Sequence, residues 1–277
     1  MNEAAVAYIT AGTAFDVPDI TFWADARHRS LDEALAGADV LVSCPDATAA
    51  FPAELEPWVS PILTREDQEA SATALSRLVA RRWAAVDPTV VYVENPHPPA
   101  VSRPDPELLG AVDPDVLAEV ASRGAGVYRA TRLQLIQRLV LTRSSSPHRP
   151  LTSLTLRDVT MPAGQPAVLS LANRGDLAGN PRPKDPLVTM DPERLRLLAD
   201  SHRTGFGVRS HDEVALNTPH RDDDEIVETA ERFGRGPEAV DAVRLDLSRQ
   251  LPTDPDAIDE VARRLRRSWV HYRTTVG

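Results

Sequence analysis

Short apolar runs, each long enough for one buried strand, alternate along this chain with longer amphipathic segments. Residues 40–43 (VLVS) and 90–93 (VVYV) are two such runs. Between them, residues 67–86 place apolar side chains at spacings of three and four, which is typical of a helix with one buried face. Strands that alternate with helices predict a layered α/β/α domain with a mostly parallel or mixed sheet.

The same alternation continues to the end of the chain. We expect further strands at 151–159, 168–172, 214–216 and 243–248, and helices at 115–122, 128–142, 191–201, 222–233 and 254–269. A length of 277 residues suffices for one large α/β domain or two small ones. Because no internal repeat or low-complexity linker divides the chain, we expect residues 1–277 to form a single domain.

Composition argues against several classes of function. The net charge of -10 is unsuited to nucleic acid, which is bound through Lys and Arg. No run approaches the roughly 18 apolar residues of a membrane-spanning helix, and no basic, apolar leader opens the chain, so no membrane partner is expected. Cys44 is the sole cysteine and excludes an intrachain disulfide. These features favour a cytoplasmic location.

Ligands of α/β sheets bind beyond the carboxyl ends of the strands, so polar residues at those positions are candidates for a site. Asp46 follows the first strand and is either a metal ligand or an Asx turn. Glu66 precedes a long helix and is either a second ligand or a charge that complements the helix dipole. His97 is a base, a ligand or a surface residue. Arg103 can pair with a substrate carboxylate through two parallel hydrogen bonds.

A second group of polar residues lies late in the chain. Asn217, Pro219 and His220 form a loop after one strand. In the last strand, Asp246 alternates with apolar neighbours and therefore lies on the polar face or on an exposed face. Arg249 follows this strand directly.

These features together resemble the N-formylglutamate amidohydrolase family. That family has an Asn-x-Pro loop, an acidic residue on a late strand followed by an arginine, and a strand that ends in Asp-x-His-Ser-Met-Pro. Here Asp158 and Met161-Pro162 match the last motif, but Thr160 replaces the His-Ser pair. Asp46 stands where the family has another histidine. The resemblance implies a phosphorylase/hydrolase-like α/β fold and metal-assisted hydrolysis of an N-acyl amino acid.

Two hypotheses follow from this resemblance and from the missing histidines. In the first, the protein is a divergent hydrolase of the C–N bond in a small, polar, carboxylate-bearing N-acyl amino acid, and it holds a divalent metal such as Zn, Mn or Fe. Its site residues would be metal ligands Asp46 and Glu66, catalytic residues Asp246 and His97, and substrate-binding residues Arg103, Asn217, His220 and Arg249. In the second, the scaffold binds no metal. It then performs another reaction in a specialised biosynthetic pathway, or binds a small anionic compound without turnover.

Overall fold

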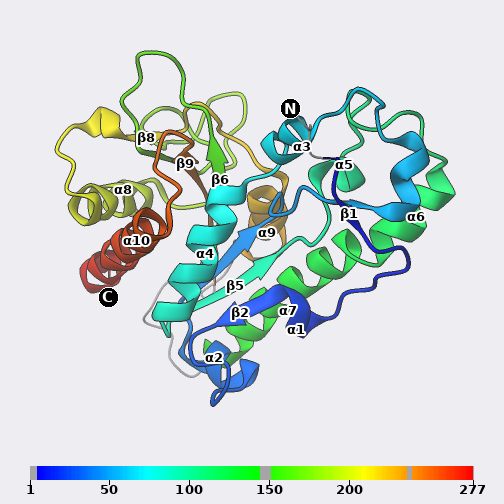
Figure 1. Ribbon diagram of the computed structural model, residues 1–277. Coiled ribbons are helices and arrows are strands. Elements are labelled where there is room, and N and C mark those ends of the chain that lie inside the picture. Colours follow the sequence, from blue (N-terminus) through cyan, green and yellow to red (C-terminus); the bar gives the residue numbers. More distant parts are fainter. Residues whose placement is uncertain (1–4, 144–150, 236–238, 277) are drawn as a thin grey trace.

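A computed structural model describes residues 5–143, 151–235 and 239–276 of the chain. Its centre is a seven-stranded sheet in the order β2-β5-β3-β6-β9-β7-β8 (Figure 1). The four strands from β5 to β9 are parallel to one another, whereas β2 is antiparallel to β5 and β7 is antiparallel to β9. The sheet is therefore mixed, as expected, with its parallel part in the middle. The strands are β2 (Thr21–Trp23), β3 (Val40–Cys44), β5 (Val90–Glu94), β6 (Leu151–Val159), β7 (Leu169–Ala172), β8 (Val214–Leu216) and β9 (Val240–Ser248).

Three helices cover one face of the sheet. They are α4 (Ala74–Val86), α8 (Pro192–Phe206) and α10 (Pro255–Val276). Their buried residues, including Trp83 and Trp269, form one hydrophobic cluster with Leu154, Leu156 and Leu245 of the sheet. Helices α8 and α10 lie side by side at the end of the molecule where the chain ends (Figure 1).

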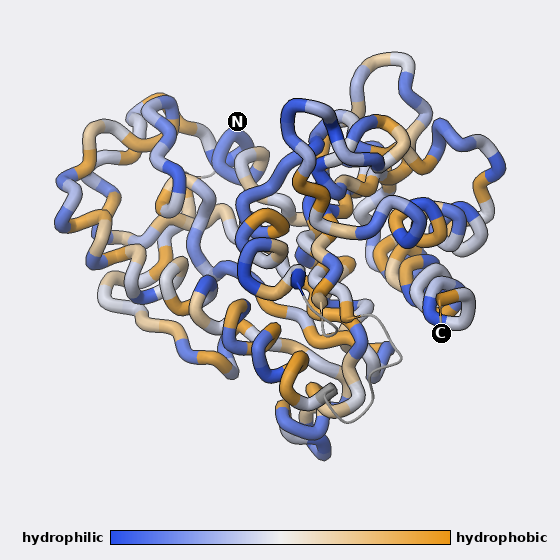
Figure 2. The backbone as a smooth tube through the Cα atoms, turned by 180° about the vertical axis from the view of Figure 1, so that it is seen from behind, coloured by the Kyte–Doolittle hydropathy of each residue, from blue (hydrophilic) through white to orange (hydrophobic). Residues whose placement is uncertain are grey.

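The opposite face is covered by α2 (Leu31–Gly37), α7 (Ala125–Arg143) and α9 (Asp224–Phe233). Its apolar cluster includes Leu41, Leu151 and Val240, which lie at the amino ends of their strands. Towards the carboxyl ends, the same face carries polar side chains, among them Ser43 and Arg157. Alternation along each strand thus gives this face an apolar half and a polar half. The change between hydrophobic and hydrophilic stretches along the backbone is visible in Figure 2.

A smaller group of elements adjoins the carboxyl ends of β3 and β5. It contains β1 (Tyr8–Ile9), β4 (Phe51–Pro52), the 3-10 helix η1 (Ala53–Trp58), α5 (Pro99–Ser102) and α6 (Pro114–Ser122). Phe51, Leu55, Val101, Leu109 and Val120 form its own small core. The short helix α3 (Arg65–Ala70) lies beside this group in Figure 1.

Local sequence signals set the limits of several helices. Ser30 and Glu33 form a capping box at the start of α2, as Thr64 and Asp67 do for α3. In α8, Asp191 caps the first turn, and Gly207 ends the helix with a φ of 70°, a conformation that glycine adopts without strain. These residues satisfy backbone groups that the helix ends leave unpaired.

The expected strands and helices are confirmed in their order, with some differences in extent. The helix expected at 67–86 is two helices, α3 and α4, because the chain turns at residues 71–73. Helices α1 (Val17–Ile20) and α2 and the edge strand β2 were not predicted, because they are too short for a clear periodic pattern. In α7 the fully buried positions include Arg132, Ile136 and Leu139.

Candidate functional site

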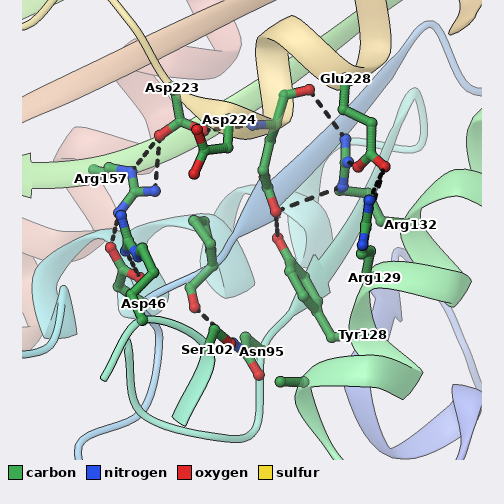
Figure 3. A pocket seen from close by; sticks show the side chains of 14 residues that line it. Asp46, Asn95, Ser102, Tyr128, Arg129, Arg132, Arg157, Asp223, Asp224 and Glu228 are labelled. Atoms are coloured by element: carbon green, nitrogen blue, oxygen red, sulfur yellow. Dashed lines mark hydrogen bonds and ion pairs between the residues drawn. The ribbon is translucent and has the colours of Figure 1, made fainter. Parts of the chain in front are cut away.

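A cleft of about 360 Å³ opens at the carboxyl ends of β3, β5 and β6. We call it the polar cleft, because charged side chains make up most of its lining (Figure 3). The loop after β3, the end of α5, the inner face of α7 and the start of α9 contribute to it. Its lining residues are Pro45, Asp46, Asn95, Ser102, Arg103, Ala125, Tyr128, Arg129, Arg132, Arg157, Asp223, Asp224, Glu225 and Glu228.

Arg157 is the central cation of the polar cleft. It lies near the end of β6, and its side chain is only 10% exposed. Its Nε donates to Asp223 Oδ2 at 2.7 Å, Nη2 lies 2.7 Å from the same oxygen, and Nη1 pairs with Asp46 Oδ2. One guanidinium therefore joins the carboxylate after β3 to the carboxylate that caps α9 (Figure 3). Buried charges of this kind persist only when they are paired and hydrogen-bonded.

Arg103 approaches the other oxygen of Asp46. It follows the last turn of α5, and its Nη2 donates to Asp46 Oδ1 at 2.8 Å. Unlike Arg157, its side chain is 54% exposed. Its other N–H groups bond to no described residue and can donate to a bound carboxylate.

Glu225 is held by donors from three different elements. Its Oε1 accepts from the Tyr128 hydroxyl at 2.6 Å, and its Oε2 accepts from Ser43 at 2.8 Å and from Thr155 at 3.2 Å. Arg132 Nε lies 3.5 Å from Oε1. Burial raises the pKa of Tyr128 well above its usual value and the neighbouring Glu225 raises it further, so the phenol stays protonated and donates. Glu225 thus ties α9 to α7 and to the sheet.

Arg132 is a fully buried cation on the inner face of α7. It donates to Thr229 Oγ1 at 2.8 Å and pairs with Glu228, which also receives Arg129 at 2.6 Å. Burial works against its charge, but Glu225 and its other anionic neighbours outweigh that effect and raise its pKa. The start of α9 is therefore fixed against α7 by ion pairs instead of apolar packing.

A chain of alternating charges continues from the polar cleft to the end of β9. Arg244 Nη1 lies 3.7 Å from Asp223 Oδ2, and Arg244 Nε donates to Asp246 Oδ1 at 2.7 Å. His220 Nδ1 lies 3.2 Å from Asp246 Oδ2. Asp246 and His220, both predicted as site residues, therefore contact each other. They lie beside the polar cleft and not in its lining.

Two other predicted substrate-binding residues make contacts within the scaffold. Asn217 is buried with a φ of 50°, and its side chain bonds the backbone and side chain of Asn173 and the carbonyl of Asp176. It therefore fixes the loop after β7. Arg249 pairs with Asp158 at 3.0 Å and bonds the carbonyl of Ala72. Neither residue lines the polar cleft.

The predicted metal ligands do not converge. Glu66 is exposed on α3, and His97 is buried against Phe15, whose ring centre is 5.7 Å away. Burial and, to a smaller extent, the positive charge of Arg123 lower the pKa of His97 to about 4. Within residues 5–143, 151–235 and 239–276, no three Asp, Glu, His or Cys side chains are grouped as metal ligands.

Asp46 is equally unsuited to a divalent ion. Guanidinium groups engage both of its carboxylate oxygens. A metal ion at this carboxylate would meet two fixed positive charges at close range, which a site of low dielectric penalises strongly. The residues here therefore do not fit the metal that the family resemblance implies.

Several residues of the polar cleft were not predicted as site residues. Arg157 was visible in principle, since it alternates with Leu154 and Leu156 and so points away from the apolar face. Tyr128 and Arg132 are spaced by four residues on one side of α7. The acidic run at residues 222–225 showed the start of a helix, but nothing in it indicated which carboxylates face a cleft.

The fold is a mixed sheet with helices on both faces, and two solved structures share it. The chain matches the crystal structure of gene product Atu2144 from Agrobacterium tumefaciens with a TM-score of 0.58 and 15% identity, over 92% of this chain and 98% of that one. It also matches N-formylglutamate amidohydrolase from Ralstonia eutropha JMP134, with a TM-score of 0.55 and 14% identity, over 86% of this chain and 95% of the other. The fold is the same as in these two proteins. No protein-family model and no curated protein matches the sequence.

None of the described helices is long and apolar enough to cross a membrane.

Proposed function

We propose that this protein binds a small, carboxylate-bearing amino-acid derivative in the polar cleft without the help of a metal ion. The observation that carries the proposal is the position of Arg157, whose guanidinium is held between Asp46 and Asp223. This guanidinium holds Asp46 in place, and Asp46 in turn orients Arg103 at the carboxyl ends of the parallel strands, where ligands of α/β folds bind. The cytoplasmic location expected from the sequence is part of the same proposal.

Arg103 is the residue that we propose contacts the ligand's carboxylate. It is half-exposed at the edge of the cleft, and only one of its nitrogens bonds to Asp46. Carboxylates prefer the planar fork of a guanidinium, which offers two parallel donors. Asp46 and Arg157 behind it keep this fork oriented.

Titration calorimetry on the full-length protein tests the proposal. The panel comprises free amino acids, their N-formyl and N-acetyl derivatives, and simple dicarboxylates. After dialysis against EDTA, we expect binding to persist, and Arg103→Met to weaken it by roughly tenfold or more, since a charge-assisted pair is lost. Arg263→Met, which removes an exposed arginine of α10, is the matched control. Binding that EDTA abolishes and Zn²⁺ restores would contradict a metal-free cleft.

Hydrolysis of the ligand's C–N bond is the second candidate function. It is favoured by the shared fold with N-formylglutamate amidohydrolase, whose name gives that reaction. The measurement is the release of free amine from N-formyl and N-acetyl amino acids, with and without added Zn²⁺, Mn²⁺ or Fe²⁺. If no free amine is released under any of these conditions from a derivative that the protein binds, hydrolysis is ruled out and the binding function remains.

A further inference from the structure

The charges that line the polar cleft do not balance. Its lining contains four guanidinium groups, those of Arg103, Arg129, Arg132 and Arg157, and five carboxylates, those of Asp46, Asp223, Asp224, Glu225 and Glu228. Four of the carboxylates pair with at least one of these arginines. The Asp224 side chain makes no hydrogen bond or ion pair with any described residue. The surplus negative charge therefore belongs to one identifiable group.

The Asp224 side chain is exposed, but the backbone that carries it is held on both sides. Asp224 is the first residue of α9, between Asp223, which caps the helix and holds Arg157, and Glu225, which is tied to α7 and the sheet. Because both neighbours are held by ion pairs or hydrogen bonds, the backbone at Asp224 has little freedom. Its side chain projects from the start of the helix into the cleft (Figure 3).

The two buried arginines of the cleft are not available to neutralise Asp224. Nε and Nη2 of Arg157 are directed at Asp223, and its Nη1 is directed at Asp46. Arg132 is buried and committed to Glu225 and Glu228. A ligand that fills the cleft removes water from Asp224, and the cost of that desolvation is offset only if the ligand brings a positive group.

We propose that the ligand of the polar cleft carries a cationic nitrogen held by Asp224, in addition to the carboxylate held by Arg103. This inference rests on the proposed binding function and narrows its ligand to zwitterions, such as amino acids with a free amine. A primary ammonium has three donors, so it can satisfy Asp224 and still bond Ser102 or water in the cleft. Acylation of that nitrogen removes the charge and breaks the match.

Calorimetry with paired ligands tests the inference on the full-length protein. The pairs are glutamate against glutarate and N-acetylglutamate, and lysine against Nα-acetyllysine and Nε-acetyllysine. We expect the tightest binder to carry a free amine, and the loss of that amine to weaken binding by roughly tenfold or more. Asp224→Asn should weaken the amine-bearing ligand by a similar factor and abolish the difference within its pair, while Asp224→Glu retains the difference.

Glu231 provides the matched control. It lies on the same helix and, like Asp224, its side chain pairs with no described residue. It lines two other hollows, of about 390 and 500 Å³, and not the polar cleft. Glu231→Gln therefore removes the same charge from α9 and should leave both members of each pair unchanged. Thermal melts of all variants verify that they are folded.

The outcomes separate this inference from the function on which it rests. If both members of every pair bind with equal affinity and Arg103→Met still loses binding, Asp224 does not hold a cationic nitrogen, but the carboxylate site at Arg103 remains supported. An equal loss for charged and acylated ligands in Asp224→Asn also overturns it. If no panel member binds the wild-type protein, both proposals are wrong.

Discussion

At the scale of single residues, Arg157 determines how the polar cleft is built. Its side chain and those of Asp46 and Asp223 are all at most 10% exposed, and its guanidinium pairs with both carboxylates. A buried pair contributes little net stability compared with an apolar replacement of both partners, but removal of one partner leaves an uncompensated charge.

We therefore expect Arg157→Met to lower the free energy of unfolding by about 3 to 5 kcal/mol, because one oxygen of Asp46 loses its partner and Asp223 keeps only the more distant Arg244. Urea denaturation at neutral pH measures the change. Arg263→Met, in an exposed pair with Glu260, should change stability by less than about 1 kcal/mol. If Arg157→Met lowers the free energy of unfolding no more than the control does, the pairing of Arg157 with Asp46 and Asp223 is not needed for stability.

His202 makes stability depend on pH. It is fully buried in α8 beside Phe206, neither ring nitrogen has a hydrogen-bond partner in the described structure, and burial lowers its pKa to about 3. The unfolded chain takes up a proton near pH 6.5, whereas the folded protein does not until about pH 3. Its contribution to stability is thus complete above pH 6.5 and is lost as the pH falls from 6.5 towards 3.

His202→Leu should remove this contribution. Between pH 7.5 and pH 5, the free energy of unfolding of the variant should fall by about 2 kcal/mol less than that of the wild type. Chemical denaturation at the two pH values gives both differences. His28→Leu is the control, since His28 is exposed beside Asp25. If both variants keep the wild-type slope, His202 is not the source of the acid sensitivity.

At the scale of elements, the contact of α8 with α10 depends on Gly205. A Cβ at this position would lie 2.1 Å from Ser268 Oγ and 2.8 Å from the carbonyl oxygen of Arg264. The Ser268 side chain can move, but the backbone of α10 cannot without displacing the buried Leu265 and Trp269.

We expect Gly205→Ala to destabilise the protein by about 1 to 3 kcal/mol through overpacking, although alanine is the better helix former. Thr204→Ala, at the neighbouring exposed position, should alter stability by less than about 0.5 kcal/mol. Thermal denaturation of the two variants compares them directly. An increase in stability for Gly205→Ala would mean that the two helices are not held as closely as the structure has them.

At the scale of the whole molecule, one sheet connects all the large helices. Its two faces carry two hydrophobic clusters, and strands such as β3 and β6 contribute residues to both. Neither cluster can lose its order without exposing the other side of the same strands.

We therefore expect residues 1–277 to unfold as a single domain in one cooperative transition. Differential scanning calorimetry should give a calorimetric enthalpy equal to the van't Hoff enthalpy. Two resolved transitions, or a van't Hoff enthalpy well below the calorimetric one, would show that the group of elements around Phe51 and Leu109 unfolds separately.

The sequence by itself determined the layered α/β architecture and the order of its main elements. Period-two runs such as residues 151–159 and period-three-to-four runs such as α10 are local properties, because each residue's face follows from its neighbours along the chain. The sequence also indicated that Asp46 and Arg103 lie at the carboxyl ends of strands, and both line the polar cleft.

Only the tertiary structure decided which charges meet. Asp46, Arg157 and Asp223 are far apart in the chain, and no local pattern states that one guanidinium takes both carboxylates. The same holds for His97 and Glu66. The positions of these residues next to predicted elements made them candidates, but neither lines the cleft. Pairing between distant charges depends on the packing of α7 and α9 against the sheet, and that packing is a property of the whole chain and not of any segment.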